Sequence, residues 1–198
     1  MTGRALLLQD LQEYERFWSC ADTSQVDRYR QFVQSSDQCC HRSHLAGHCT
    51  GSAFVSSPSL DRVLLLYHPF LKRWLQPGGH ADGQTDLLDV ARREAHEETG
   101  LSLEELLPAE LEVGRRIPFD LDIHPIPARK SEPEHFHYDL RFLLLADPGK
   151  EIIPEKEDMP VEWLSLEQVE ERTDEESVLR MVRKLRSLRS GSSLTSSR

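Results

Sequence analysis

The sequence contains no apolar run that approaches the length of a membrane-spanning helix. The apolar part of its opening segment, MTGRALLLQD, is also too short for a secretory signal peptide. Hydrophobic residues still make up 38% of the 198 residues, which is enough to build a core. We therefore expect a cytoplasmic protein without a membrane partner, consisting of one domain of about 150 residues with appendages.

Cysteine is scarce, and no two of the cysteines form a CxxC pair. The four cysteines are Cys20, Cys39, Cys40 and Cys49. Thiols stay reduced in the cytoplasm, so free or buried thiols are the favoured interpretation. A zinc site formed by Cys39, Cys40 and His41 is the alternative.

Basic residues are outnumbered, with 24 Lys and Arg against 34 Asp and Glu and a net charge of −10. Residues 177–198 hold six Lys and Arg and no acid, so residues 1–176 carry −16. A surface this acidic does not attract nucleic acid, and no nucleic-acid partner is expected. A substrate with phosphates needs a metal ion or local basic residues to bind.

The start of the chain has apolar residues at helical spacing. The pattern predicts two helices over residues 5–34, the second after a cap at Thr23 and Ser24. The apolar positions of the two helices are Leu8, Leu11, Tyr14, Phe17, Trp18, Val26, Tyr29, Phe32 and Val33. Aromatic residues at this spacing are typical of packing, so the segment is predicted to be a helical extension packed on the domain.

Strand patterns occupy much of the remaining chain. They cover residues 47–57, 62–68, 110–124, 134–146 and 161–164. The unbroken apolar run of 62–68 predicts a strand buried on both faces. In 134–146, His135, His137, Asp139 and Arg141 alternate with apolar residues and therefore share one face. A solvated sheet face and a phosphate or sugar site are equally compatible with this pattern.

Helices are predicted again near the end of the chain. Ser165 with Gln168, and Thr173 with Glu176, have the spacing of capping boxes that open helices. The Ser-rich residues 191–198 have the composition of a disordered tail.

The most informative stretch is residues 78–101, GGHADGQTDLLDVARREAHEETGL. Thr85 is a plausible cap for a helix that Gly100 ends. On that helix Glu94, Glu97 and Glu98 share one face. Their repulsion, and their place at the negative end of the helix dipole, are both unfavourable. This arrangement predicts a bound cation, and oxygen ligands suit Mg²⁺ or Mn²⁺.

From Gly79 the stretch follows the spacing G-x5-E-x7-R-E-U-x-E-E-x-G-U, where U is bulky and apolar, except at Thr85 and Ala95. It resembles the signature of the Nudix hydrolases. The segments WLQPGGHADG, FDLDIHPIPAR and HFHYDLRF resemble a bacterial subgroup of that family. The resemblance implies an α/β/α sandwich around a mixed sheet. The expected organisation is a helical N-terminal extension (1–45), a Nudix domain (46–172), a C-terminal helix (173–190) and the tail (191–198).

The resemblance also implies a role for each residue of the motif. Glu97 and Glu98 would be the main metal ligands, and Glu94 would bind metal or act on the attacking water. The carbonyl of Gly78 would complete the metal shell, and Arg93 would orient a glutamate. The ion would neutralise a diphosphate and activate water for attack on phosphorus.

Two further acids are expected to support the motif. Thr85 replaces a family glutamate that pairs with the arginine of the motif, and we expect Asp86 to pair with Arg93 instead. A late-loop acid is a further catalytic candidate, and Glu157 is favoured. The other two candidates are Glu155 and Asp158.

Contacts with substrate are predicted outside the acidic helix. The candidates are His80, Arg129, His135, His137 and Arg141. They would bind a small nucleoside diphosphate derivative, and a homodimer is a further expectation.

The sequence is compatible with three functions. The first is a Mg²⁺- or Mn²⁺-dependent hydrolase of a diphosphate linkage. The second is a Nudix-fold isomerase of the isopentenyl diphosphate type, for which Cys49 would supply a proton. The third is a non-catalytic nucleotide sensor, which the intact acids argue against.

Overall fold

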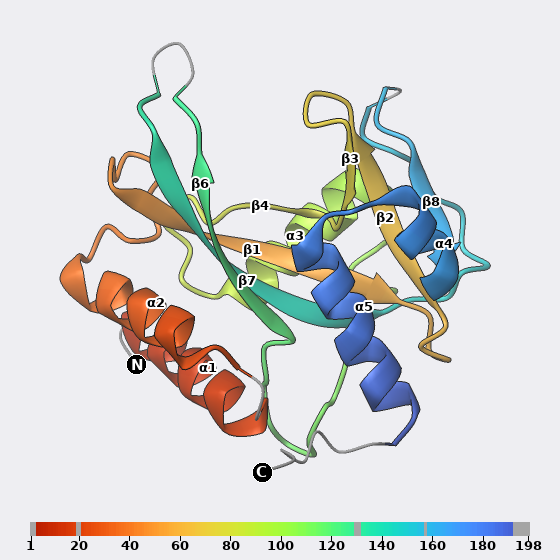
Figure 1. The fold of residues 1–198 in the computed structure, drawn as a ribbon, viewed down its shortest axis with the longest axis horizontal. Helices are drawn as coiled ribbons and strands as arrows, with labels where there is room; N and C mark the ends of the chain where they lie inside the picture. The colour runs from red at the N-terminus through yellow and green to blue at the C-terminus, as the bar shows by residue number, and fades with distance from the viewer. Residues whose placement is uncertain (1–2, 19–20, 129–131, 157, 192–198) are drawn as a thin grey trace. The chain divides into compact units, whose positions relative to one another are not determined.

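The computed structural model describes residues 3–18, 21–128, 132–156 and 158–191 (Figure 1). Its helices are α1 (Gly3–Phe17), α2 (Thr23–Ser35), α3 (Leu87–Thr99), α4 (Leu166–Arg172) and α5 (Glu176–Arg189). Its strands are β1 (Gly47–Ser56), β2 (Arg62–His68), β3 (Arg73–Leu75), β4 (Gly78–His80), β5 (Leu107–Pro108), β6 (Asp120–Ile126), β7 (His135–Leu145) and β8 (Val161–Ser165). None of the described helices is long and apolar enough to cross a bilayer.

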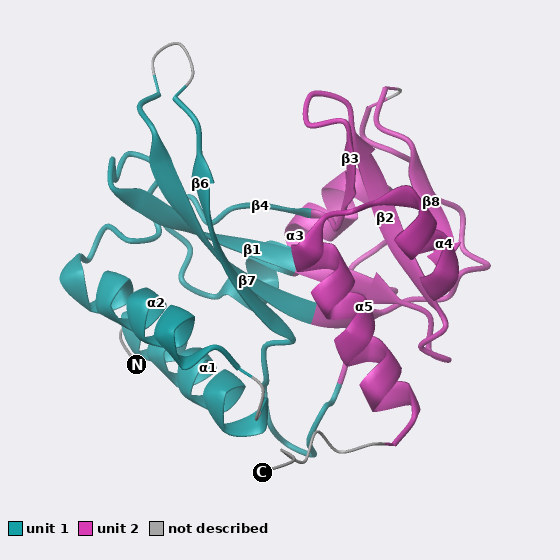
Figure 2. Cartoon of the chain, viewed as in Figure 1, with its two compact units in different colours: residues 1–52, 78–91, 110–142 teal, residues 53–77, 92–109, 143–198 magenta. Residues whose placement is uncertain are grey.

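The chain forms two compact units (Figure 2). Unit 1 comprises residues 1–52, 78–91 and 110–142, and unit 2 comprises residues 53–77, 92–109 and 143–198. The elements β1, β7 and α3 each begin in unit 1 and end in unit 2. The acidic glutamates of α3 therefore belong to unit 2, and the glycines before the helix belong to unit 1.

The strands pair along the hydrogen-bonded order β3-β2-β1-β7-β5, with β4 on β1, β6 on β7 and β8 on β2. In unit 1, β6 is antiparallel to β7, and β4 is antiparallel to β1, with Thr50 opposite His80. In unit 2, β2 lies between β3 and β8 in antiparallel pairing. The apolar run of β2 is buried from Val63 to Leu66, as its sequence predicts.

The two N-terminal helices pack inside unit 1 through their aromatic residues. The hydroxyl of Tyr29 donates to the carbonyl of Tyr138 at 2.7 Å, and Phe32 stacks on the Tyr138 ring with centroids 3.7 Å apart. The indole of Trp18 donates to the Pro118 carbonyl at 2.9 Å. These contacts confirm that the aromatic residues serve packing. The cap of α2 is Asp22, one residue before the predicted one.

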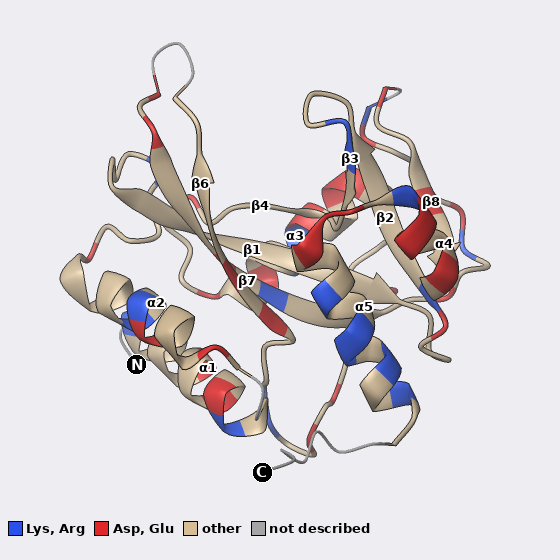
Figure 3. Ribbon diagram, viewed as in Figure 1, with Lys and Arg blue, Asp and Glu red and all other residues tan. Residues whose placement is uncertain are grey.

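In unit 2 the predicted capping box at the start of α4 is present, with Ser165 and Gln168 bonding each other's backbone amides. The second predicted box is wrong, because α5 begins at Glu176 and Glu175 makes no side-chain cap bond. One face of α5 is buried, through Val178, Met181, Val182 and Leu185. Lys and Arg line much of the rest of the helix (Figure 3).

Two parts of the strand prediction differ from the structure. The strand predicted within 110–124 begins only at Asp120, and residues before it form turns and irregular backbone. The short strands β3, β4 and β5 were not predicted, because strands of two or three residues carry no periodic pattern. The predicted tail at 191–198 lies almost entirely outside the described residues.

Removing residues 1–34 is expected to destabilise the protein, because Tyr138 then loses its partners Tyr29 and Phe32. Thermal unfolding followed by circular dichroism checks this expectation. Removal of residues 192–198 is the matched control, and it should leave the melting temperature unchanged because the segment is Ser-rich. A truncated chain starting at residue 35 that melts like the full chain would show the helices to be an independent arm.

Candidate functional site

The acidic helix α3 is fixed at both ends by its own sequence. The carboxylate of Asp86 accepts from the amides of Leu88 at 3.1 Å and Asp89 at 3.2 Å, so Asp86 caps the helix in place of the predicted Thr85. At the other end Gly100 has a φ of +74°, and a Cβ there would lie 2.8 Å from Ile153. Both space and conformation therefore require glycine at the helix end.

Arg93 connects two of the three predicted metal-binding glutamates. Its Nη1 lies 2.7 Å from Oε1 of Glu94 and 3.4 Å from Oε2 of Glu97. The side chain of Glu94 is 15% exposed and that of Glu97 is 49% exposed. One guanidinium thus orients a partly buried and an exposed carboxylate, and the metal-binding role of both stays a prediction.

The loop that carries the candidate acids Glu155 and Asp158 contacts the C-terminal end of α3. The amide of Ile153 donates to the carbonyl of Thr99 at 2.8 Å. The pKa of Lys156 is raised, first by its hydrogen bond with Glu155 and also by the charge of Glu98. Unit 2 therefore brings the loop with the candidate late acids to the glutamate-bearing end of the helix. Glu157 itself lies outside the described residues.

The start of α3 is tied to the N-terminal helix by Arg116, within unit 1. Its guanidinium lies 2.7 Å from Asp86 and 2.9 Å from Asp10 of α1, and it stands over the Phe142 ring at 5.2 Å. The expected pair between Asp86 and Arg93 is therefore wrong, because Arg116 and the helix backbone occupy the Asp86 carboxylate. Sequence reasoning missed Arg116 because its segment has no periodic pattern.

Burial raises the pKa of Asp10 from its ordinary 3.8 to about 7, although Arg116 opposes the shift. Because the native state holds this proton more tightly, the stabilising contribution is complete below pH 3.8 and is lost as pH rises through 7. Asp10→Asn should therefore gain stability relative to wild type across that window, by up to about 4 kcal/mol at 1.36 kcal/mol per pKa unit. Urea unfolding of both proteins at pH 5 and pH 8 measures the change. A difference between the two proteins that is the same at both pH values would contradict the shift.

Arg141, a predicted substrate contact, lies in a buried ion cluster of unit 1. It is 2% exposed. Its guanidinium lies 2.7 Å from Asp139, 3.3 Å from Asp122 and 3.4 Å from Asp120. These contacts give Arg141 a structural role in the ion cluster, and its contact with substrate stays a prediction. The predicted shared face of β7 is thus buried here, not solvated.

The same cluster shapes the glycine turn before α3. Thr50 and Ser52 of β1 donate to Asp139, each at 2.9 Å. Ser52 pairs with Gly78 across the strands, and a Cβ on Gly78 would lie 2.2 Å from the Ser52 hydroxyl. Only glycine fits at this position, which explains one of the two glycines in the motif.

Two of the predicted substrate contacts, His135 and His137, lie together in unit 1 with ring centroids 5.3 Å apart. His80 lies beside them, 5.1 Å from His137. His48 of β1, which sequence reasoning missed, lies 4.8 Å from His137. Its alternation with Thr50 along β1 was the available signal. Arg129 lies outside the described residues.

Burial shifts the titration of three of these imidazoles. Burial, and then the charges of His80 and His135, lower the pKa of His48 to about 4. Burial also lowers the pKa of His137 and of His80. The neutral form of these three rings, which carries a lone pair on one ring nitrogen, is therefore favoured.

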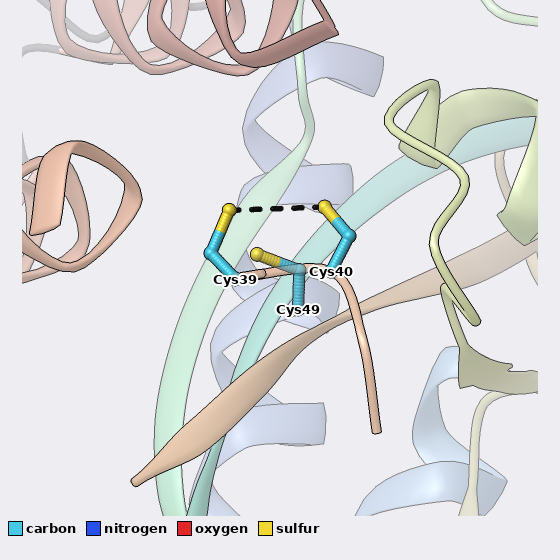
Figure 4. Close-up of side chains that lie close together, drawn as sticks. All are labelled: Cys39, Cys40 and Cys49. Carbon is cyan, nitrogen blue, oxygen red and sulfur yellow. Dashed lines mark hydrogen bonds between the residues drawn. The ribbon is translucent and has the colours of Figure 1, made fainter. Parts of the chain in front are cut away.

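Three thiols meet elsewhere in unit 1 (Figure 4). The sulfurs of Cys39 and Cys40 are 3.9 Å apart, and Cys49 completes the group. All three are free and buried, as predicted. Cys49, not His41, is the third member. Burial raises the pKa of Cys49 well above its ordinary value, which makes it a poor proton donor.

Comparison with known sequences settles the family. The sequence model of the NUDIX domain matches residues 52–185. The chain belongs to the Nudix family. A relative from Lactococcus lactis subsp. cremoris, named "Probable DHNTP pyrophosphohydrolase", is 32% identical over 111 residues. The match covers 56% of this chain and 61% of that protein, so the chain spans less than two thirds of its relative.

Solved structures agree on the Nudix fold. A C. elegans Ap4A hydrolase is 19% identical, with a TM-score of 0.55, covering 72% of this chain and 98% of that one. A NUDIX-family hydrolase from Clostridium perfringens is 21% identical, with a TM-score of 0.52, covering 71% and 97%. The predicted α/β/α Nudix fold with a mixed sheet is thereby confirmed.

Proposed function

We propose that this Nudix chain is a Mg²⁺- or Mn²⁺-dependent hydrolase that cleaves a diphosphate linkage in a nucleoside diphosphate derivative. The observation that carries the proposal is the acidic face of α3, where Arg93 binds both Glu94 and Glu97. The pyrophosphohydrolase name of the Lactococcus relative supports the same reaction class.

The donor set of α3 fits a hard divalent cation. Glu94, Glu97 and Glu98 present oxygen ligands on one helix face, which Mg²⁺ and Mn²⁺ prefer. When bound, such an ion neutralises phosphate charge and activates water. Arg93 positions two of the carboxylates, and the Gly78 carbonyl stays a predicted further ligand.

A late-loop acid would accept the proton of the attacking water in this proposal. The bond between Ile153 and Thr99 supports this role, because it holds the loop against the end of α3. Glu155 lies 3.0 Å from Lys156, whereas Glu157 remains the predicted choice from sequence. His80, Arg129, His135 and His137 remain predicted substrate contacts.

The isomerase alternative requires Cys49 as its proton donor, and the surroundings of Cys49 argue against that role. Cys49 is fully buried among thiols, and its pKa is raised. The sensor alternative is disfavoured by the intact acids of the helix. Release of a phosphate-containing product distinguishes hydrolysis from both.

The deciding experiment is a product-resolved screen with Mg²⁺ and with Mn²⁺. The substrates are dinucleotides, nucleotide sugars, nucleoside triphosphates, CDP-alcohols and capped RNA. Ap4A and DHNTP come first, because the names of the related proteins include them. Hydrolysis of any of these compounds that depends on added metal supports the proposal. A chain that releases no product from any class, although it binds the metal, would contradict it.

Mg²⁺ is expected to raise the melting temperature, because an ion that binds only the native state stabilises it by mass action. Each kcal/mol gained should add about 2–4 °C for a chain of this size. Differential scanning fluorimetry with and without millimolar Mg²⁺ measures the shift, and Glu97→Gln should reduce it. Equal melting temperatures with and without Mg²⁺ or Mn²⁺ would favour a merely solvated acidic face.

A further inference from the structure

Five imidazoles from four strands of unit 1 form one cluster, which we call the histidine cluster. Its members are His48 of β1, His80 of β4, His124 of β6, and His135 and His137 of β7. The rings of His48, His135 and His137 approach within 4.8–5.3 Å of each other, centroid to centroid. One ring nitrogen from each of these three lies within 4.8 Å of the others.

The centre of the histidine cluster has unsatisfied polar atoms. His48 is 2% exposed, and neither of its ring nitrogens has a hydrogen-bond partner among the described residues. The buried Nε2 of His137 also lacks a partner within that part of the chain. Each such atom costs about 1–3 kcal/mol when it stays unpaired. Three unpaired nitrogens at one point therefore indicate a missing ligand.

Neighbouring residues hold two rings of the cluster, those of His135 and His124, in the orientation that metal ligands need. Nδ1 of His135 lies 2.9 Å from the carbonyl of Pro133. Nδ1 of His124 lies 2.9 Å from the carboxylate of Asp122. A histidine that binds metal commonly donates its other ring nitrogen to a carbonyl or carboxylate in this way. Nε2 of His135 thereby remains available for the centre of the cluster.

The chemistry of the cluster favours a cation over a phosphate. A cation site needs lone pairs that converge, and one ring nitrogen from each of His48, His135 and His137 lies within 4.8 Å of the others. Neutral imidazoles present lone pairs, and these suit zinc, copper, nickel and iron, not magnesium. The carboxylate of Asp122 bonds His124 and approaches Arg141 at 3.3 Å.

We propose that His48, His135 and His137 form a binding site for a divalent transition-metal ion of the zinc class, with His80 and His124 beside it. Ligands 2.0–2.1 Å from zinc in a tetrahedron lie roughly 3.4 Å apart. The three rings need only small rotations to reach that spacing from 4.8 Å. A site with three histidines leaves a fourth position open for water or another ligand.

The site differs in chemistry from the acids of α3, which offer only oxygen. It also differs from the thiol group of Cys39, Cys40 and Cys49, whose sulfurs lie within 4.8 Å of one another. A metal assay must separate all three sets. Because the readout is binding, its result is independent of whether the chain hydrolyses a diphosphate.

The test is titration of the chelator-treated full chain with Co²⁺ and Zn²⁺ in millimolar Mg²⁺, which saturates oxygen-ligand sites. We expect one ion per chain, visible-region Co²⁺ absorption of a nitrogen and oxygen ligand set, and a Zn²⁺-dependent rise in melting temperature. His48→Gln and His137→Gln should each weaken metal binding at least ~10-fold. Losing a residue that only hydrogen-bonds a metal ligand already costs about 10–100-fold in affinity, so losing a ligand should cost no less.

Three matched controls should bind like wild type. His41→Gln removes an exposed histidine outside the cluster, Cys49→Ser removes a thiol, and Glu97→Gln removes an acid of α3. If the histidine variants do not fold, the wild-type Co²⁺ spectrum decides. An intense thiolate-to-metal charge-transfer band, or binding lost only in Cys49→Ser, would overturn the proposal. Absence of binding by wild type at micromolar metal would overturn it as well.

Inorganic phosphate supplies the remaining arm of the test. If phosphate without transition metal raises the melting temperature of wild type but not of His48→Gln, the cluster is an anion site and the metal proposal fails. No effect of phosphate on either protein, together with His48-dependent Zn²⁺ binding, is the expected result.

Discussion

Replacing Glu97 or Glu98 with Gln is expected to lower kcat at least ~100-fold, beyond the 10–100-fold usual when only an outer partner of a metal ligand is lost. Each substitution removes one negative charge and keeps the size of the side chain. Glu97 is 49% exposed, so its loss leaves no cavity and no unpaired buried charge. The fold should remain intact, because in the proposed function a metal ion, and not packing, compensates these charges.

The measurement is kcat and KM on the substrate that the screen identifies, with circular dichroism to confirm folding. Glu171→Gln, which alters an exposed acid of α4, is the matched control and should retain wild-type kcat. Arg93→Lys tests positioning, because lysine keeps the charge but replaces the planar guanidinium that contacts Glu94 and Glu97 with a compact ammonium on a flexible stem. A Glu97→Gln or Glu98→Gln variant with near-wild-type kcat would remove that residue from the metal site.

Local patterns explain what the sequence could predict. The acidic helix follows from helical spacing between a cap and Gly100, and the alternation of β7 follows from the two-residue period of a strand. The capping box of Ser165 and Gln168 depends on residues three apart. Each of these features is encoded within a few neighbouring residues, so no knowledge of the tertiary structure is needed.

Long-range ion pairs explain what the sequence could not predict. Arg116 binds Asp86, 30 residues earlier, and Asp10, 106 residues earlier. No local period marks such a partnership, so Asp86 was paired with Arg93, seven residues ahead on the same helix. The buried role of Arg141 was hidden for the same reason, because its carboxylates come partly from β6.

The histidine cluster could be predicted from the sequence only in part. The alternation of β7 brings His135 and His137 to one face, and the sequence shows it. His48 joins them only through the pairing of β1 in the sheet, which the pattern of β1 alone does not specify. The sequence therefore predicts that His135 and His137 share a face, and only the structure shows that His48 lies beside them.

Arg141→Met is expected to unfold the protein or to cost at least about 3–5 kcal/mol, because it leaves buried carboxylates without their cation. Asp120 and Asp139 are 0% and 2% exposed, so water cannot replace the guanidinium. A loss of this size approaches the whole stability of an ordinary domain, about 5–15 kcal/mol. Urea unfolding measures it, with Arg186→Met as matched control. Arg186 of α5 pairs with Glu170 of α4, and both side chains are more than a third exposed. Ion pairs of this kind contribute about 0–1 kcal/mol to stability.

The same variant separates the structural role of Arg141 from the substrate contact that its sequence position suggests. An arginine that binds substrate would leave stability unchanged when replaced and would raise KM. Replacing an arginine that neutralises Asp120, Asp122 and Asp139 would instead lower the stability of the fold. Arg141→Met combined with Asp139→Asn should then recover part of the loss, because one buried negative charge is removed together with the arginine. Recovery links the effect to the ion cluster, since a substrate contact would not be restored by changing a carboxylate that is 2% exposed. Wild-type stability of Arg141→Met together with a raised KM would reverse this assignment and return Arg141 to the substrate site.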